Sequence, residues 1–228
     1  MKGITLIFLL IIISLNVNGK NNTSIGFNFE PIISKNIYVL NPNAEYGHFI
    51  DLNEHDNWDF GYKFGVSFEK DIIKNCSVSI GLDYKTIQDI YYNDLRFVFT
   101  YHGIFPTYKS HNKLSTDLRY ISLPIGLIYQ VIDFKKFRVG INPKTSTDFL
   151  LNDNDSEDQF ATNHSKIVLS SNIGMRIDFN LFEKVRFIIT PDYGITISNI
   201  NHIKFLDNNY ATQRNHYFGL NLGLRYDL

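Results

Sequence analysis

The chain has 228 residues, of which 22 are Lys or Arg, 23 are Asp or Glu and one, Cys76, is a cysteine. This near-neutral charge gives none of the basic surface that nucleic-acid binding requires, and a lone cysteine excludes a disulfide within the chain. The length suits a single domain of sandwich or barrel type rather than two packed domains. We therefore expect one domain, with no nucleic-acid partner.

The first segment has the three-part layout of a secretion signal. Lys2 precedes a run over 4–13 that is apolar except for Thr5, and Val17 and Gly19 occupy the first and third positions of the expected cleavage triplet. The run is too short to anchor the chain as a spanning helix, which needs ~20 apolar residues. We predict a signal peptide over 1–19 and an exported domain over 20–228.

Eight segments of alternating apolar and polar residues follow, and this is the period of a β-strand. They cover 24–30, 58–69, 77–87, 118–132, 137–149, 167–179, 185–197 and 215–227. Short connections over 70–75, 133–136 and 180–184 alternate with long polar ones over 31–57, 88–117, 150–166 and 198–214. This alternation predicts an all-β, antiparallel up-and-down barrel with both ends of the mature chain on the short-turn side.

Alternation alone does not say which face is inside, because a soluble lipocalin-like barrel would turn its apolar face inward. The glycines favour the opposite arrangement. Side chains crowd on the concave face of a narrow barrel, so residues without a side chain belong there. Ten glycines share the polar parity of their strands, namely Gly26, Gly61, Gly65, Gly81, Gly126, Gly140, Gly174, Gly194, Gly219 and Gly223. The polar face is therefore predicted to be inside and the apolar face to meet lipid.

The predicted inner face carries eight bases and seven acids. They are Glu30, Lys63, Glu69, Asp83, Lys85, Arg119, Arg138, Lys144, Asp148, Arg176, Asp178, Arg186, Asp192, Arg225 and Asp227. Such a balanced set should pair and fill a narrow bore, so we expect no open channel. Pro124, Pro143 and Pro191 lie inside strand patterns and are expected at bulges or strand ends.

Aromatic residues cluster at the predicted strand ends, which suits the two interface girdles of a membrane barrel. Those beside the short turns are Phe134, Phe137, Phe179 and Phe182, and those toward the long connections are Trp58, Phe60, Tyr91, Tyr92, Tyr193 and Tyr217. The sequence thus predicts an eight-stranded transmembrane β-barrel in the cell outer membrane, with both mature termini in the periplasm.

The segment Tyr120-Ile121-Ser122-Leu123-Pro124 resembles the Tyr-x-x-Ile/Leu-Pro strand of the Bacteroidetes outer-membrane β-barrel family that includes the PorT-like proteins. Two further stretches are similar to strands of that family, Asp192-Tyr193-Gly194 to Ile200 and Asn142-Pro143 to Leu151-Asn152. Leu228 stands where proteobacterial barrels commonly end in an aromatic residue. The resemblance implies a fold and an outer-membrane location, and it supplies no active-site residue.

Three groups of residues are the candidates for chemistry. His48, Asp51, His55 and Asp56 in the first long connection could bind zinc or form an Asp/His pair, although their spacing matches no zinc motif. The acidic run 153–158 offers oxygen ligands for calcium but lacks the glycine and distant glutamate of an EF-hand. His216, on the lipid-facing parity, could serve a lipid hydrolase if a serine and an acid stood beside it. None is assigned as a catalytic, metal or cofactor site.

Three hypotheses follow from the pattern. The first is a non-enzymatic outer-membrane barrel that contacts an extracellular ligand through its long loops or serves an export or envelope complex. The second is a barrel enzyme, either a protease or a lipid hydrolase, that uses residues such as His48, Asp51 and His216. The third is a soluble lipocalin-like carrier, which would place Phe64, Leu123 and Leu222 in its lumen.

Overall fold

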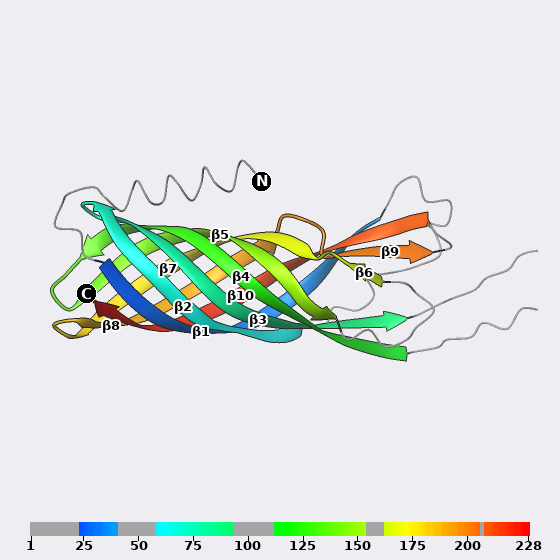
Figure 1. Ribbon diagram of the computed structural model, residues 1–228, viewed down its shortest axis with the longest axis horizontal. Coiled ribbons are helices and arrows are strands. Elements are labelled where there is room, and N and C mark those ends of the chain that lie inside the picture. The colour runs from blue at the N-terminus through cyan, green and yellow to red at the C-terminus, as the bar shows by residue number, and fades with distance from the viewer. Residues whose placement is uncertain (1–22, 41–57, 94–111, 154–161, 206–207) are drawn as a thin grey trace, which may run out of the picture.

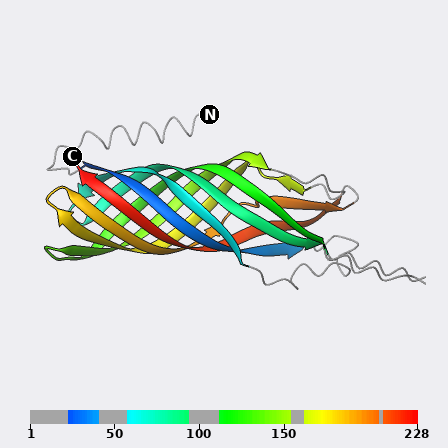
Figure 2. The ribbon, with the colours of Figure 1, turned by 90° about the horizontal axis from the view of Figure 1, so that it is seen from below.

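The computed structural model describes residues 23–40, 58–93, 112–153, 162–205 and 208–228. Eight long strands form one antiparallel sheet in the order β1-β2-β3-β4-β5-β7-β8-β10, and pairing between β1 and β10 closes this sheet into a barrel (Figures 1 and 2). The strands run obliquely around the barrel axis. Within the described ranges, no helix is long and apolar enough to cross a membrane. The predicted eight-stranded antiparallel barrel is confirmed.

The strands follow the order of the sequence, and each ring strand pairs with the ring strands before and after it. Their bounds are β1 Thr23–Leu40, β2 Asp59–Ile73, β3 Cys76–Asn93, β4 Asn112–Asp133, β5 Phe137–Asp153, β6 Thr162–His164, β7 Ile167–Phe182, β8 Val185–Thr196, β9 Asn201–Phe205 and β10 Asn208–Asp227. The start of β1 and the C-terminus lie at the same end of the barrel as the tight β7–β8 turn (Figure 1). Both ends of the described chain therefore lie on the short-turn side.

Burial alternates along the strands with the predicted parity. Phe64 and Leu123 are 49% and 41% exposed on the outside, whereas Arg176 and Asn221 are 3% and 7% exposed inside. The outer surface is thus covered with large apolar side chains, and the lumen holds most of the buried polar groups. An exposed apolar belt on a closed barrel is the arrangement that a bilayer requires. The hypothesis of a soluble carrier with an apolar lumen is wrong.

The strands are longer than the alternating segments that predicted them. β4 has 22 residues and β10 has 20, whereas a tilted strand needs roughly 9–11 to cross a bilayer. Strand pairing continues beyond the apolar belt on the long-loop side, because ladder hydrogen bonds between neighbouring strands do not depend on an apolar face. Two short strands absent from the prediction, β6 and β9, extend the sheet from β10 within the connections expected to be loops.

The three prolines expected at bulges or strand ends lie inside strands instead, and the register does not shift at any of them. On one side of Pro143, the β4–β5 pairing passes from Gly126↔Lys144 to Tyr129↔Ile141 at constant register. On the other side, Pro143 pairs with Ile173. A proline lacks one N–H, so it weakens the ladder with one neighbour and leaves the other intact. The barrel therefore tolerates these prolines, and the expectation of bulges at them is wrong.

The tight turns at the short-turn end include a left-handed residue where β2 meets β3. Asn75 has a φ of 68°, and Asn is among the few non-glycine residues that adopt this conformation readily. Cys76 follows as the first residue of β3 and is half-buried on the outward parity. Exposed Phe134 and Phe182 flank the other two short turns, as expected of an interface girdle.

Candidate functional site in the barrel lumen

Fourteen of the fifteen charged residues that were predicted to line the lumen have the inward parity of their strands, with Arg138 at its short-turn rim. The exception is Arg119, which shares the outward parity of Ile121 and is exposed near the long-loop end of the belt. Without Arg119 the set consists of seven bases and seven acids, so its formal charges cancel. The prediction that Arg119 faces inward is wrong because parity within β4 places Leu118 and Tyr120 inside instead.

The cluster nearest the short turns is a network of arginines and carboxylates. Arg176 donates from Nε and Nη2 to the two carboxylate oxygens of Asp178, at 2.6 and 2.7 Å, and from Nη1 to Glu69 Oε2 at 2.8 Å. Arg225 forms a second ion pair with the same Glu69 oxygen. Arg186 connects Asp178, at 3.1 Å, to Asp227, at 2.5 Å. Three arginines and three acids thus balance each other around the inside of the wall.

The middle of the lumen is built from lysines and acids. Lys63 Nζ lies 2.7 Å from Glu30 Oε2, which also accepts a hydrogen bond of 3.1 Å from Asn221. Lys144 Nζ lies 3.9 Å from Asp192 Oδ2, which accepts a 2.7 Å hydrogen bond from Asn172. A Cβ atom at Gly219 would lie 2.6 Å from both Glu30 Oε1 and Asp192 Oδ1. Only a glycine leaves room there for two carboxylates side by side.

The third cluster lies toward the long loops and is centred on Asp148. Its carboxylate accepts hydrogen bonds from Lys85 at 2.7 Å, Ser122 at 2.6 Å and Ser170 at 2.9 Å. Lys85 Nζ also lies 5.4 Å from the centre of the Tyr217 ring, within the range of a cation–π interaction. Tyr217 was predicted to belong to an interface girdle, and this is wrong, because its ring is buried inside the barrel.

Beyond Asp148 the buried inner residues include an apolar cluster among polar ones such as Gln213 and Asn215. Leu118, Tyr120, Val168 and Ile200 form a buried cluster, against which Leu150 packs. Ile200 belongs to the segment between β8 and β9, and its backbone is held from both sides: its N–H donates to Gln213 O at 2.8 Å and its carbonyl accepts from Ser165 N at 2.7 Å. This apolar cluster therefore fills part of the long-loop end of the lumen, next to buried polar side chains.

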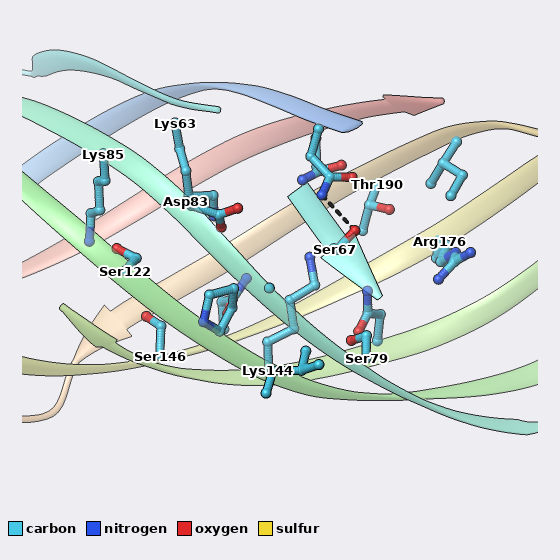
Figure 3. A pocket seen from close by; sticks show the side chains of 18 of the residues that line it. Lys63, Ser67, Ser79, Asp83, Lys85, Ser122, Lys144, Ser146, Arg176 and Thr190 are labelled. Carbon is cyan, nitrogen blue, oxygen red and sulfur yellow. Dashed lines mark hydrogen bonds between the residues drawn. The ribbon is translucent and has the colours of Figure 1, made fainter. Parts of the chain in front are cut away.

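The space left between these clusters is small. A cavity of about 50 Å³ is bordered by side chains from several strands, among them Lys63, Asp83, Lys144 and Arg176 (Figure 3). It has room for roughly three or four water molecules, which suits Asp83 Oδ1 and Asn142 Oδ1, two buried oxygens that accept no hydrogen bond from a protein group. The arrangement is that of a packed ionic interior that ties the strands to one another.

Most of the sequence-predicted chemical candidates lie outside the residues that the structure describes. His48, Asp51, His55 and Asp56 lie outside the described residues, as does 154–158 of the acidic run, and Asp153 ends β5. His216 lies outside the barrel, where its Nδ1 forms a hydrogen bond with the Tyr193 hydroxyl. Among the residues that the structure describes, no group of three or more His, Cys, Asp or Glu residues could hold a metal ion.

A closed ring of eight antiparallel strands, apolar outside and ionic inside, defines this chain as a small β-barrel of the outer-membrane type. Its sequence matches the family model for the outer membrane protein beta-barrel domain over residues 13–228. The chain therefore belongs to that family, and its location is the lipid bilayer of the outer membrane.

Three solved structures illustrate the likeness. Neisserial surface protein A has a TM-score of 0.48 and 10% identity, with 90% of this chain and 97% of that chain covered. The outer membrane protein AlkL, solved in lipid bilayers, has a TM-score of 0.49 and 14% identity, with coverages of 92% and 91%. The outer membrane protease OmpT from Escherichia coli has a TM-score of 0.44 and 10% identity, with coverages of 91% and 96%. A comparison with curated protein sequences found no significant match.

Proposed function

We propose that this protein is a non-enzymatic outer-membrane barrel that acts through the β-structure on its long-loop side. The observation that carries the proposal is that the sheet continues beyond the apolar belt. β1 and β10 stay paired out to Leu40↔Ala211, and β9 and β6 add two further strands to that edge. Backbone pairing makes this region an ordered platform rather than a set of separate loops, and an ordered platform is suited to presenting a contact surface.

The second part of the proposal concerns direction: the platform faces the outside of the cell and both mature termini face the periplasm. Support comes from the short turns at one end and the extended strands at the other, the asymmetry typical of outer-membrane barrels. A Cys76→Ser background allows a direct test with single cysteines at Ser156 and Lys135. A membrane-impermeant maleimide added to intact cells should label Ser156→Cys, and label Lys135→Cys only after permeabilisation. The reverse pattern would overturn this orientation.

The lumen supports a passive structural role rather than transport. Most of its charged groups are engaged with one another in three clusters, and buried apolar and polar side chains fill the long-loop end beyond them. We infer a barrel that conducts no ions. In that case the protein contributes to the envelope by what binds its exposed ends: an extracellular ligand at the platform, or an envelope or export partner at the short-turn end.

The alternative of a barrel protease or lipid hydrolase makes a different prediction. His216 is held by a tyrosine hydroxyl, and a hydrolase histidine would need a serine nucleophile and an acid at that level. In a strain lacking the gene, a His48→Ala/Asp51→Ala variant should restore any envelope phenotype fully. A variant with 203–211 replaced by an Asn-Gly turn, which would join the register partners His202 and Thr212, should not restore it. The opposite pair of results would favour the enzyme.

We also propose that the chain falls in the PorT-like, Bacteroidetes branch of its family. The support is the Tyr120–Pro124 segment, which lies in β4. The ring of Tyr120 is directed into the lumen, and its centre lies 5.7 Å from Lys85 Nζ. If the segment serves assembly of this barrel, Tyr120→Ala should reduce the heat-modifiable fraction in the outer membrane. This is the fraction of the protein that migrates differently in detergent gels before and after boiling. Phe134→Ala, at an exposed turn, should leave that fraction unchanged. Equal effects would remove the special role of the segment.

A further inference from the structure

The β4–β5 turn carries two consecutive lysines at the short-turn end of the barrel. Lys135 and Lys136 are both exposed, and the turn is closed by a hydrogen bond of 2.9 Å from Phe134 N to Phe137 O. Connections as tight as this one favour Gly, Asn or Asp, whose backbones adopt turn conformations readily. The backbone geometry therefore does not explain why lysine stands at both positions.

The position of this turn is fixed by the neighbouring strand β7. Asn180, near the end of that strand, donates from its backbone N–H to Lys136 O at 3.0 Å and from Nδ2 to Lys135 O at 2.9 Å. One residue thus holds both lysine carbonyls, and the two side chains leave an anchored backbone. Because less of the chain has to be ordered on binding, an anchored turn binds a ligand at a lower cost in conformational entropy than a loose loop does.

The two ammonium groups are available to an anion from outside the chain. Within the part of the chain that the structure describes, neither lysine forms an ion pair. Asp133, next to the turn, is paired with Arg138 Nε at 3.3 Å. Glu183, an exposed acid on the neighbouring β7–β8 turn, is followed directly by a lysine of its own. The β4–β5 turn therefore presents a local positive charge.

Phenylalanine rings lie next to the turn and place it at the border of the bilayer. Phe134 is 55% exposed, and its ring centre lies 4.9 Å from that of Phe137. Phe137 is the register partner of Phe179, and Phe182, 74% exposed, is the last residue of β7. Exposed aromatic rings at strand ends belong to the interface of a membrane barrel, and lysine side chains extend from that level into the headgroup layer. The two ammonium groups therefore lie where lipid phosphates lie.

We propose that Lys135 and Lys136, with Phe134, Phe137 and Phe182 beside them, form a binding site for the headgroup of an anionic phospholipid. The ammonium groups pair with the phosphate, and the rings contact the glycerol and the adjoining ends of the acyl chains. A zwitterionic headgroup carries a cation of its own, whereas the charge of an anionic headgroup is left to the lysines. In the proposed orientation of the barrel this lipid belongs to the periplasmic leaflet, but the binding itself does not depend on that orientation.

Brominated lipids can measure this preference, because bromine quenches tryptophan fluorescence on contact. Trp58, the sole tryptophan, directly precedes β2 at the opposite end of the barrel, so a Trp58→Phe/Phe134→Trp variant places the reporter in the proposed site. This variant would be folded into phosphatidylcholine vesicles with increasing fractions of dibrominated phosphatidylglycerol or, in parallel, dibrominated phosphatidylcholine. We expect phosphatidylglycerol to bind about tenfold more tightly than phosphatidylcholine, as expected for two lysines beside an anionic headgroup.

In the same reporter background, Lys135→Gln/Lys136→Gln should abolish the preference to within about twofold, because glutamine is polar but carries no charge. The matched control is Lys74→Gln/Lys184→Gln, which removes two lysines from the other two short turns. Lys184 Nζ lies 5.7 Å from the centre of the Tyr226 ring and is thus directed toward β10. The control should keep the tenfold preference to within about twofold. Equal loss in the two double variants would overturn the site and leave a general attraction of the rim for anionic lipid.

Two further measurements test the ligand and the place. Soluble glycerol phosphate at millimolar concentration should leave the quenching unchanged, and relief of quenching would overturn the lipid assignment in favour of a free phosphate. In the wild-type chain Trp58 should report no preference between the two lipids, and an equal preference there would overturn the assignment to the β4–β5 turn. Neither result depends on which way the barrel faces, which the maleimide labelling of Ser156→Cys and Lys135→Cys reports independently.

Discussion

Glu69 is the residue on which the cluster nearest the short turns depends, because one of its oxygens neutralises both Arg176 and Arg225. Glu69→Ala would leave two buried guanidinium groups short of a counter-charge. We expect a loss of about 3–5 kcal/mol in the free energy of unfolding, measured by denaturant titration in lipid vesicles.

The matched control for Glu69 is Asp133→Asn, which breaks the exposed ion pair with Arg138 and should cost less than about 1 kcal/mol. Equal losses in the two variants would show that the luminal network does not stabilise the barrel more than a surface ion pair does.

Gly194 provides a second test at the residue scale, because the ring of Tyr217 would overlap a Cβ atom there. Gly194→Ala should destabilise the barrel by about 1–3 kcal/mol through overpacking. The double variant Gly194→Ala/Tyr217→Ala should lose less unfolding free energy than the sum of the losses in the two single variants, because Tyr217→Ala removes the ring that the new Cβ atom would overlap. Gly223→Ala, which meets the movable side chain of Asn28, serves as the control. Additive costs would contradict the proposed overlap.

Each strand has one face toward the lipid and one toward the ionic interior. The loss in the free energy of unfolding caused by a charge on the lipid face should depend on how deep in the bilayer that charge lies. Leu123→Arg, in the middle of β4, should cost about 2–4 kcal/mol, whereas Leu151→Arg, at the long-loop end of β5, should cost roughly 0–1 kcal/mol. Reversible unfolding in phospholipid vesicles measures both. Similar costs at the two positions would mean that the apolar belt lies elsewhere on the barrel.

The lumen of the molecule is filled along its length, by ionic clusters near the short turns and in the middle and by a mixture of apolar and polar side chains near the long loops. We therefore expect no stepwise conductance when the wild-type protein is reconstituted in planar bilayers. Glu69→Ala/Arg176→Ala/Arg225→Ala and Tyr120→Ala/Ile200→Gly should each stay silent, because the clusters around Glu30 and Asp148 still fill the middle of the lumen. Conductance by the wild-type protein would show that the lumen is not closed by these side chains.

Much of this architecture could be predicted because a barrel strand has a two-residue period. Once glycines and charges were seen to share one parity, the lumen and the lipid face were determined for most positions. Arg119 and Tyr217 were misassigned: the first has outward parity although it is charged, and the second has inward parity although it is aromatic. For both residues, parity within the strand gave the correct side and the chemical type gave the wrong one.

The sequence by itself determined the class of fold, the number of membrane-crossing strands and the two faces of each, because these depend on local alternation and on the room that a narrow bore allows. Only the tertiary structure decided which charges pair, how Ile200 packs against Leu118 and Val168, and how Lys35 becomes the register partner of His216. These contacts join residues up to nearly two hundred positions apart, and they follow from the register and stagger at which the sheet closes on itself. No local pattern in the chain records that stagger.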